Sequence, residues 1–289
     1  MSARLRVALV IGRRQANESL LSPGFYLMTT IAISLGCFLV AGFTTAIDSS
    51  GFNPGQSAPY ELLTRALSGA FGVTFVEKLF AEGPFAFALL ACALPVLLYL
   101  SIASVFRFGQ EKGAGYVELL VYGPADGTSC FLAVFLKDVL LAAVSLAALA
   151  LALTAAAGFA HLATGPLFRW TLLVAFLVCL PVFAYGILCS IVAANPSGAL
   201  ALFLGTQLVF LLVFAGSFAI VGATLHTVSS VVASVLQWAS PLYYAGLCFR
   251  AIEAAQPALF AAGGVMLVVL AAALLAVAHV AIRFAGVRA

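Results

Sequence analysis

The sequence predicts an all-α membrane protein with six transmembrane helices, and two observations support this fold class. Of its 289 residues, 64% are hydrophobic and only 8% are charged, whereas a soluble domain carries roughly 25% charged residues. The stretches 83–106, 139–168 and 254–282 contain no Asp, Glu, Lys or Arg, and each exceeds the ~20 apolar residues that cross a bilayer. A longer uncharged stretch, 170–249, has room for two more spans, with a break at 195–198.

We place the spans at 25–46, 84–106, 139–160, 170–193, 199–222 and 258–282. The first apolar run is longer than the roughly 7 to 15 residues of a signal peptide core, so we expect it to be an anchor. With both termini inside, the inner segments carry nine Lys and Arg residues and the outer ones four. This asymmetry favours an N-in, C-in topology. The chain then forms a single transmembrane domain, 1–289.

Segment 1–24 is basic and leads to Ser22-Pro23 before the first span. We expect an interfacial helix in which arginines lie near anionic headgroups; its candidate residues are Arg13, Arg14 and Glu18. The alternative is a solvated, positively charged tail.

Segment 107–138 concentrates charge in a chain that is otherwise nearly free of it. Arg107, Glu111, Lys112, Glu118 and Lys137 all fall here, which indicates contact with water or with a soluble partner. Residues 116–122 can form a short helix that ends at Gly123-Pro124. An amphipathic helix along the inner membrane face is the expected form.

The outer segments are 48–82 and 223–257. In the second, valines recur at helical spacing before Trp238 and two tyrosines, residues that favour the membrane interface. We expect a short helix, a break at Ser240-Pro241 and a second short helix, both dipping into the outer leaflet. The alternative is an ordinary amphipathic loop.

No catalytic or metal-binding constellation is visible. The six cysteines form no CxxC pair, so we expect neither a metal site nor a disulfide framework. The sequence around 109–113 lacks the GxxxxGK[ST] order that cradles phosphates, and the expected span interiors lack ionisable residues other than histidine, which disfavours ion-coupled transport. Thr206 and Gln207 are the candidates for a translocation path, although packing between helices is their commoner role.

Three motifs, which together span most of the chain, resemble permeases of type-2 ABC exporters, in particular the branch related to gliding-motility permeases. The first is Glu18 through Ser22-Pro23 to the aromatic Tyr26. The second resembles the coupling helix that docks on the ATPase, with Tyr116 in place of the usual threonine and Ala133-Val134 in place of Gly-Lys. The third precedes the last span, with Ala251 in place of a glycine. The residues of the second motif are Glu111, Gly115, Tyr116, Glu118, Leu119, Leu120 and Pro124, and those of the third are Ser240, Pro241, Arg250 and Glu253.

The resemblance implies a permease in the bacterial inner (plasma) membrane that binds no cofactor itself and is driven by two copies of a separate ABC ATPase, which bind ATP and Mg. Glu111 and Glu118 would make polar contacts to the ATPase, while Leu119 and Leu120 would seat the helix. The other expected partners are a second permease, identical or related, membrane lipid and an extracytoplasmic accessory subunit; nucleic acid is not expected.

Two other functions stay open at this level. One is a non-transporting anchor that transmits ATPase motion to a motility or envelope machine. The other is an ion-coupled carrier or channel, which the uncharged span interiors disfavour. A membrane enzyme is disfavoured by the lack of a catalytic set, and the substrate is not encoded in any readable motif.

Overall fold

The computed structural model describes residues 3–50, 79, 84–114, 127–219, 234, 237–254 and 256–284. Within these ranges the chain is helical and has no strand. Six helices are long and apolar enough to cross a membrane, which confirms the predicted all-α class and the predicted number of candidate spans. They are α2 (Pro23–Ser50), α5 (Phe85–Gly113), α7 (Gly127–Phe159), α8 (Pro166–Val192), α9 (Pro196–Ala219) and α12 (Pro257–Phe284), accompanied by the shorter α1 (Ala3–Leu20) and α11 (Pro241–Glu253).

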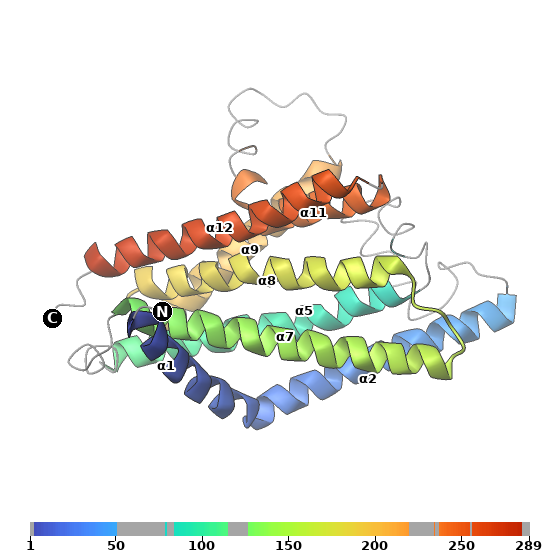
Figure 1. Ribbon diagram of the computed structural model, residues 1–289, viewed down its shortest axis with the longest axis horizontal. Coiled ribbons are helices and arrows are strands. Elements are labelled where there is room, and N and C mark those ends of the chain that lie inside the picture. Colours follow the sequence, from blue (N-terminus) through green and yellow to red (C-terminus); the bar gives the residue numbers. More distant parts are fainter. Residues whose placement is uncertain are drawn as a thin grey trace.

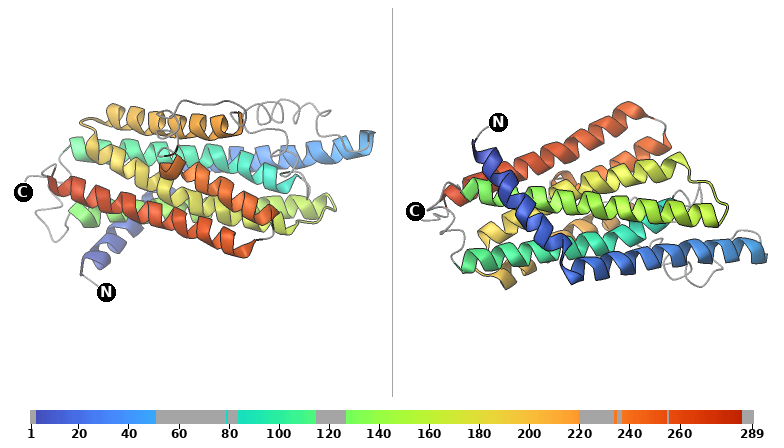
Figure 2. Two further views of the ribbon diagram at one scale, coloured as in Figure 1. Left: turned by 90° about the horizontal axis from the view of Figure 1, so that it is seen from above. Right: turned by 60° about the horizontal axis from the view of Figure 1, so that its bottom comes forward.

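The six long helices run side by side along the longest axis of the molecule (Figure 1). Helix α1 begins and α12 ends at the same end of this bundle. We call this end of the bundle the α1 end, because α1 crosses the bundle there obliquely and packs on α7 (Figure 2). At the α1 end α5 finishes, α7 begins, and α8 turns into α9. The opposite end, where α11 ends and α12 begins, is called the α11 end.

The core of the bundle lies where α2, α5, α7 and α8 meet. Phe87, Leu89, Leu149, Leu153 and Phe183 are among its buried side chains. In the apolar windows of α5 and α8, 56% of residues are buried, against 17% in α9 and 22% in α12. Helices α5 and α8 are therefore the centre of the bundle, while α9 and α12 turn most of their apolar side chains outward.

Proline marks the start of most helices. Pro23, Pro166, Pro196, Pro241 and Pro257 are each the first residue of a helix, where the missing backbone N–H costs no hydrogen bond and the fixed φ suits the helix. The breaks expected at Ser22-Pro23, within 195–198 and at Ser240-Pro241 are confirmed, as are helical structure in the N-terminal segment and a second short helix after Pro241. The first short helix expected near Val228 lies outside the described residues.

Two helix boundaries differ from the expectation by more than a few residues. Helix α5 continues to Gly113 rather than ending near 106, and α7 begins at Gly127 rather than near 139. Arg, Glu and Lys are good helix formers, so a change to charged sequence ends the apolar stripe without ending the helix. Most of segment 107–138 is therefore a helical extension of α5 or α7, and only 115–126 lies between them, outside the described residues.

Candidate functional site

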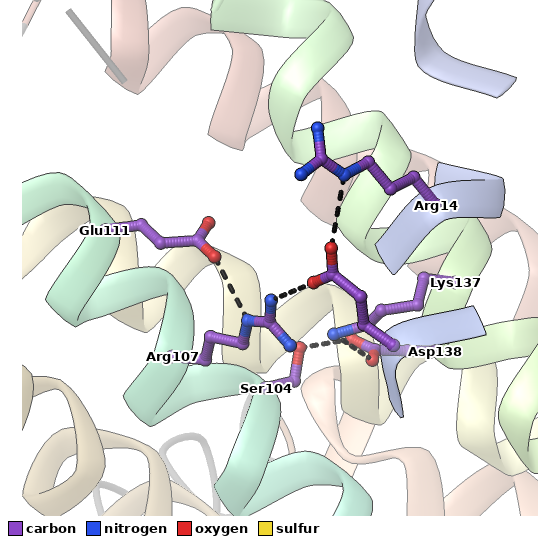
Figure 3. Close-up of polar contacts among 7 residues, drawn as sticks. Arg14, Ser104, Arg107, Glu111, Lys137 and Asp138 are labelled. Atoms are coloured by element: carbon purple, nitrogen blue, oxygen red, sulfur yellow. Dashed lines mark hydrogen bonds and ion pairs between the residues drawn. The ribbon is translucent and has the colours of Figure 1, made fainter. Parts of the chain in front are cut away.

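Charged side chains gather at the α1 end, where α1, α5, α7 and α8 meet (Figure 3). They form two groups. The buried cluster consists of Ser104 on α5 with Lys137 and Asp138 on α7. The rim network consists of Arg14 and Glu18 on α1 with Arg107 and Glu111 on α5.

The buried cluster is an ion pair held inside the helix bundle. Lys137 Nζ lies 3.1 Å from Asp138 Oδ1, and the two side chains are only 6% and 2% exposed. Ser104 Oγ donates a hydrogen bond to the other carboxylate oxygen. A buried charge is tolerated only when it is paired and hydrogen-bonded, and Asp138 has both kinds of partner here.

The surroundings of Asp138 are polar but closely packed. Ser101 and Ser190 line the same narrow space together with apolar side chains of α5 and α8, and this space is too small to admit a water molecule. Ser190 Oγ donates to the backbone oxygens of Val105 and Gly186, at 3.2 and 2.9 Å. The buried cluster is therefore a solid polar contact between helices rather than an open binding pocket.

The position of Lys137 and Asp138 corrects one part of the sequence reading. Both residues were expected at the water-facing end of segment 107–138, but both are buried. Asp138 faces α5 and α8, where Ser104 and Ile187 are among its neighbours. Helix α1 also packs on α7: Ala8, Gly12 and Ala16 are buried, and a Cβ added to Gly12 would lie 3.0 Å from the Ala133 carbonyl oxygen.

Two sequence signals could have revealed this arrangement. Small residues recur every fourth position along α1, at Ala8, Gly12 and Ala16, a spacing that lets helix backbones approach closely. Lys137 and Asp138 are also adjacent residues of opposite charge at the start of a long apolar run. Adjacent residues point to different sides of a helix, so both can be buried only if the helix is covered on more than one side.

The rim network joins α1 to α5. Arg107 Nη2 lies 2.7 Å from Glu18 Oε2, and Arg107 Nε lies 3.1 Å from Glu111 Oε1. Arg14 Nε contacts the other Glu18 oxygen at 3.2 Å. The hydrogen bonds from Arg107 and then Arg14 lower the pKa of Glu18 below its usual value. Arg14, Glu18 and Glu111 were site candidates from sequence, whereas Arg107, which connects them, was not.

Lys112 ties the end of α5 to the turn between α8 and α9. Its Nζ donates to the backbone oxygens of Ile191 and Ala193, at 2.6 and 3.0 Å. Cations stabilise the C-terminal end of a helix, where carbonyl groups lack helical partners. Gly109 packs at the same place, because a Cβ there would lie 3.0 Å from Pro196 Cα.

The other sequence candidates lie apart from these clusters. On α9, Thr206 Oγ1 donates to the Leu202 carbonyl at 2.7 Å, and Gln207 Nε2 is buried with no partner among the described residues. Arg13 is exposed on α1. The coupling candidates after Glu111 lie outside the described residues: Gly115, Tyr116, Glu118, Leu119, Leu120 and Pro124.

The start of α11 is fixed to the second half of α8, away from the end where α11 finishes. Tyr185 Oη on α8 donates to the Ala239 carbonyl at 2.7 Å, and Tyr244 Oη donates to the Trp238 carbonyl at 2.9 Å. Ser240 is buried directly before Pro241. Arg250 lies in the last turn of α11, and the side chain of Glu253 lies outside the described residues.

Within the described ranges, no three His, Cys, Asp or Glu residues come close enough together to hold a metal ion. The six cysteines are free thiols, and five of them are buried, so they pack as small apolar residues. The contacts of the buried cluster and the rim network hold α1, α5 and α7 together at the α1 end.

Comparison of the chain with protein-family models, with curated proteins and with solved structures finds no match.

Proposed function

We propose that this protein is the transmembrane permease subunit of an ATP-binding-cassette exporter, driven by a separate ATPase subunit. The observation that carries the proposal is the length of two helices at one end of the bundle. Helices α5 and α7 have 29 and 33 residues, whereas ~20 residues cross the hydrocarbon core. Both helices are therefore longer than a membrane span requires. Their charged ends border residues 115–126, which contain most of the motif that resembles the coupling helix.

The contacts at the α1 end support a role in force transmission. Lys112 ties α5 to the α8–α9 turn, Arg107 ties α5 to α1, and Ser104 with Asp138 ties α5 to α7. A conformational signal travels through packed elements that move as units. An ATPase that pushes on 115–126 would therefore move α1, α5, α7 and α8 together rather than bend a loose loop.

The remaining parts of the proposal concern assembly and location. Two permease chains and two ATPase copies, which bind ATP and Mg, form the transporter in the bacterial inner membrane, with the α1 end inside. The substrate passes between the permeases, where Thr206 and Gln207 on α9 are the candidate path residues. Helix α11 dips into the outer leaflet, and an extracytoplasmic subunit binds near segment 48–82.

Purification from the native host in mild detergent, followed by mass spectrometry of what remains bound, tests the proposal directly. We expect a stoichiometric P-loop ATPase. Glu118→Lys should leave membrane insertion intact while uncoupling ATP hydrolysis from transport, because it reverses a charge in the motif that would dock on the ATPase. Glu82→Lys, on the side expected to lie outside, is the matched control. A well-folded preparation without an ATPase, or normal transport by Glu118→Lys, would contradict the proposal.

The buried cluster favours a second candidate function, an ion-coupled carrier. The sequence argument against such a carrier was that the span interiors are uncharged, yet Lys137 and Asp138 are buried within α7. Ionisable residues at such depth often mark ion or proton pathways. Transport that follows an imposed ion gradient without ATP would support this function. The space around Asp138 is too small to admit a water molecule, and this favours the exporter over an ion-coupled carrier.

A further inference from the structure

Helix α1 has two different faces. One face consists of the buried small residues Ala8, Gly12 and Ala16, and it packs on α7. The opposite face is exposed and combines arginines with apolar side chains. Val10 on this face is 71% exposed, so insertion among lipid chains would remove its apolar surface from water, which is favourable.

The exposed residues are ordered around the helix. At about 100° per residue, Val10 lies opposite the buried stripe, with Arg6 and Arg13 on one side and Arg14 on the other. Leu21, directly after the helix, is 76% exposed. Apolar residues flanked by basic ones are the pattern of helices that lie in the membrane interface, with the apolar side chains among the lipids and the cations at the headgroups.

The fold holds α1 at the depth where such a face meets headgroups. Only Leu21 and Ser22 separate α1 from α2, whose membrane-spanning part begins at Pro23. The three Cα–Cα steps from Leu20 to Pro23 reach at most about 11 Å, so the end of α1 stays close to the membrane surface. The helix also crosses the direction of the long helices obliquely (Figure 2).

The charge balance of this surface is positive. Arg14 and Arg107 share Glu18, and Arg107 also pairs with Glu111. Arg6 and Arg13 are exposed and have no acidic partner among the described contacts. Four arginines therefore face two glutamates, and the excess charge lies on the outer face of α1.

We propose that the outer face of α1 binds anionic phospholipid headgroups through Arg6, Arg13 and Arg14, with Val10 inserted between the lipids. Anionic lipid then seats α1 in the interface while its small-residue face stays on α7. The inference needs only that the bundle spans a membrane, so it holds or fails independently of the exporter proposal.

A single tryptophan placed on this face can test the proposal. Val10→Trp is made in a background of Trp170→Phe and Trp238→Phe, which removes both native tryptophans. The full chain is reconstituted into nanodiscs of phosphatidylcholine alone or mixed with phosphatidylglycerol. Quenching of the introduced tryptophan by lipids that carry a nitroxide near the headgroup, or by iodide in the buffer, reports whether the side chain lies in lipid or in water.

We expect lipid quenching that is at least twofold stronger with phosphatidylglycerol, is reduced by high salt because salt screens the arginines, and is lost in Arg6→Gln/Arg13→Gln. Arg169→Gln, at an exposed arginine in the first turn of α8, is the matched control and should change nothing. Equal quenching in the two lipid mixtures would overturn charge recognition. Strong iodide quenching in both mixtures would overturn membrane docking. It would indicate instead that the outer face of α1 is open to water and available to a soluble protein. The comparison of the two lipid mixtures keeps all native arginines. It therefore tests the proposal even if Arg6→Gln/Arg13→Gln misfolds.

Discussion

The buried cluster and the rim network use the same kinds of side chain at neighbouring levels of the bundle, yet they differ in exposure. Ser104 and Arg107 are three residues apart on α5, a rise of roughly 4.5 Å. The side chains of the Lys137–Asp138 pair are 6% and 2% exposed, whereas those of the Arg107–Glu18 pair are 42% and 44% exposed. Less than one helical turn therefore separates an ion pair in a dry environment from one in contact with solvent.

This difference changes what each ion pair contributes. Removing one partner of a buried pair leaves an uncompensated charge, which costs about 3–5 kcal/mol. An exposed pair is screened by water and salt and contributes about 0–1 kcal/mol. The buried cluster should therefore dominate the stability of the α1 end, while the rim network mainly fixes the orientation of α1 against α5.

The largest effect should come from Asp138→Ala. The substitution leaves the Lys137 ammonium buried without its partner, so we expect a loss of about 3–5 kcal/mol in the free energy of unfolding, measured by denaturant titration in detergent micelles. Lys137→Met/Asp138→Leu removes both charges and should cost much less. If the double variant were as unstable as the single one, packing rather than charge would explain the cluster.

Gly12→Leu should have the next largest effect, because it disrupts the close packing of α1 on α7. A Cβ at Gly12 would lie 3.0 Å from a backbone oxygen of α7, which cannot move aside easily. We expect a loss of about 1–3 kcal/mol and faster proteolysis within α1. Gly158→Leu is the matched control, since a Cβ at Gly158 meets nothing within 4 Å. Equal proteolysis of α1 in both variants would argue against the tight contact between α1 and α7.

Arg107→Gln should affect stability less, although it removes ion pairs to both Glu18 and Glu111. Its side chain is 42% exposed, so we expect a loss of about 1 kcal/mol or less. The same denaturant titration measures it, beside Asp138→Ala. A loss as large as that of Asp138→Ala would remove the distinction between the two clusters.

The smallest effect should be the pH dependence that comes from Glu18. Arg107 and Arg14 lower the pKa of Glu18, so the unfolded chain binds its proton more readily than the folded protein. This stability is complete above the ordinary value of 4.5 and is lost as the pH falls through the lower pKa of the folded state. Glu18→Gln should flatten the dependence of Tm on pH in this acidic range. An unchanged profile would mean that Glu18 is not ion-paired in solution.

Much of the fold follows from local features of the sequence. The number of spans follows from apolar length, and the helix starts at Pro23, Pro196 and Pro241 follow from the chemistry of proline. The lengths of α5 and α7 were less predictable, because charged residues continue a helix as readily as apolar ones. Site residues such as Glu18 and Glu111 were recognised from motifs, but their common partner Arg107 was not.

The sequence alone determined that the chain has six helices long and apolar enough to cross a membrane, because apolar length and proline position act within a single segment. Only the tertiary structure decided that α1 folds onto α7, that Lys137 and Asp138 become buried as a pair, and that Arg107 meets Glu18 from a helix 89 positions away. The physical reason is that burial of a charge depends on which distant helix covers it. For Asp138 the covering helices are α5 and α8, which contribute Ser104 and Ile187, rather than the residues next to the charge along the chain.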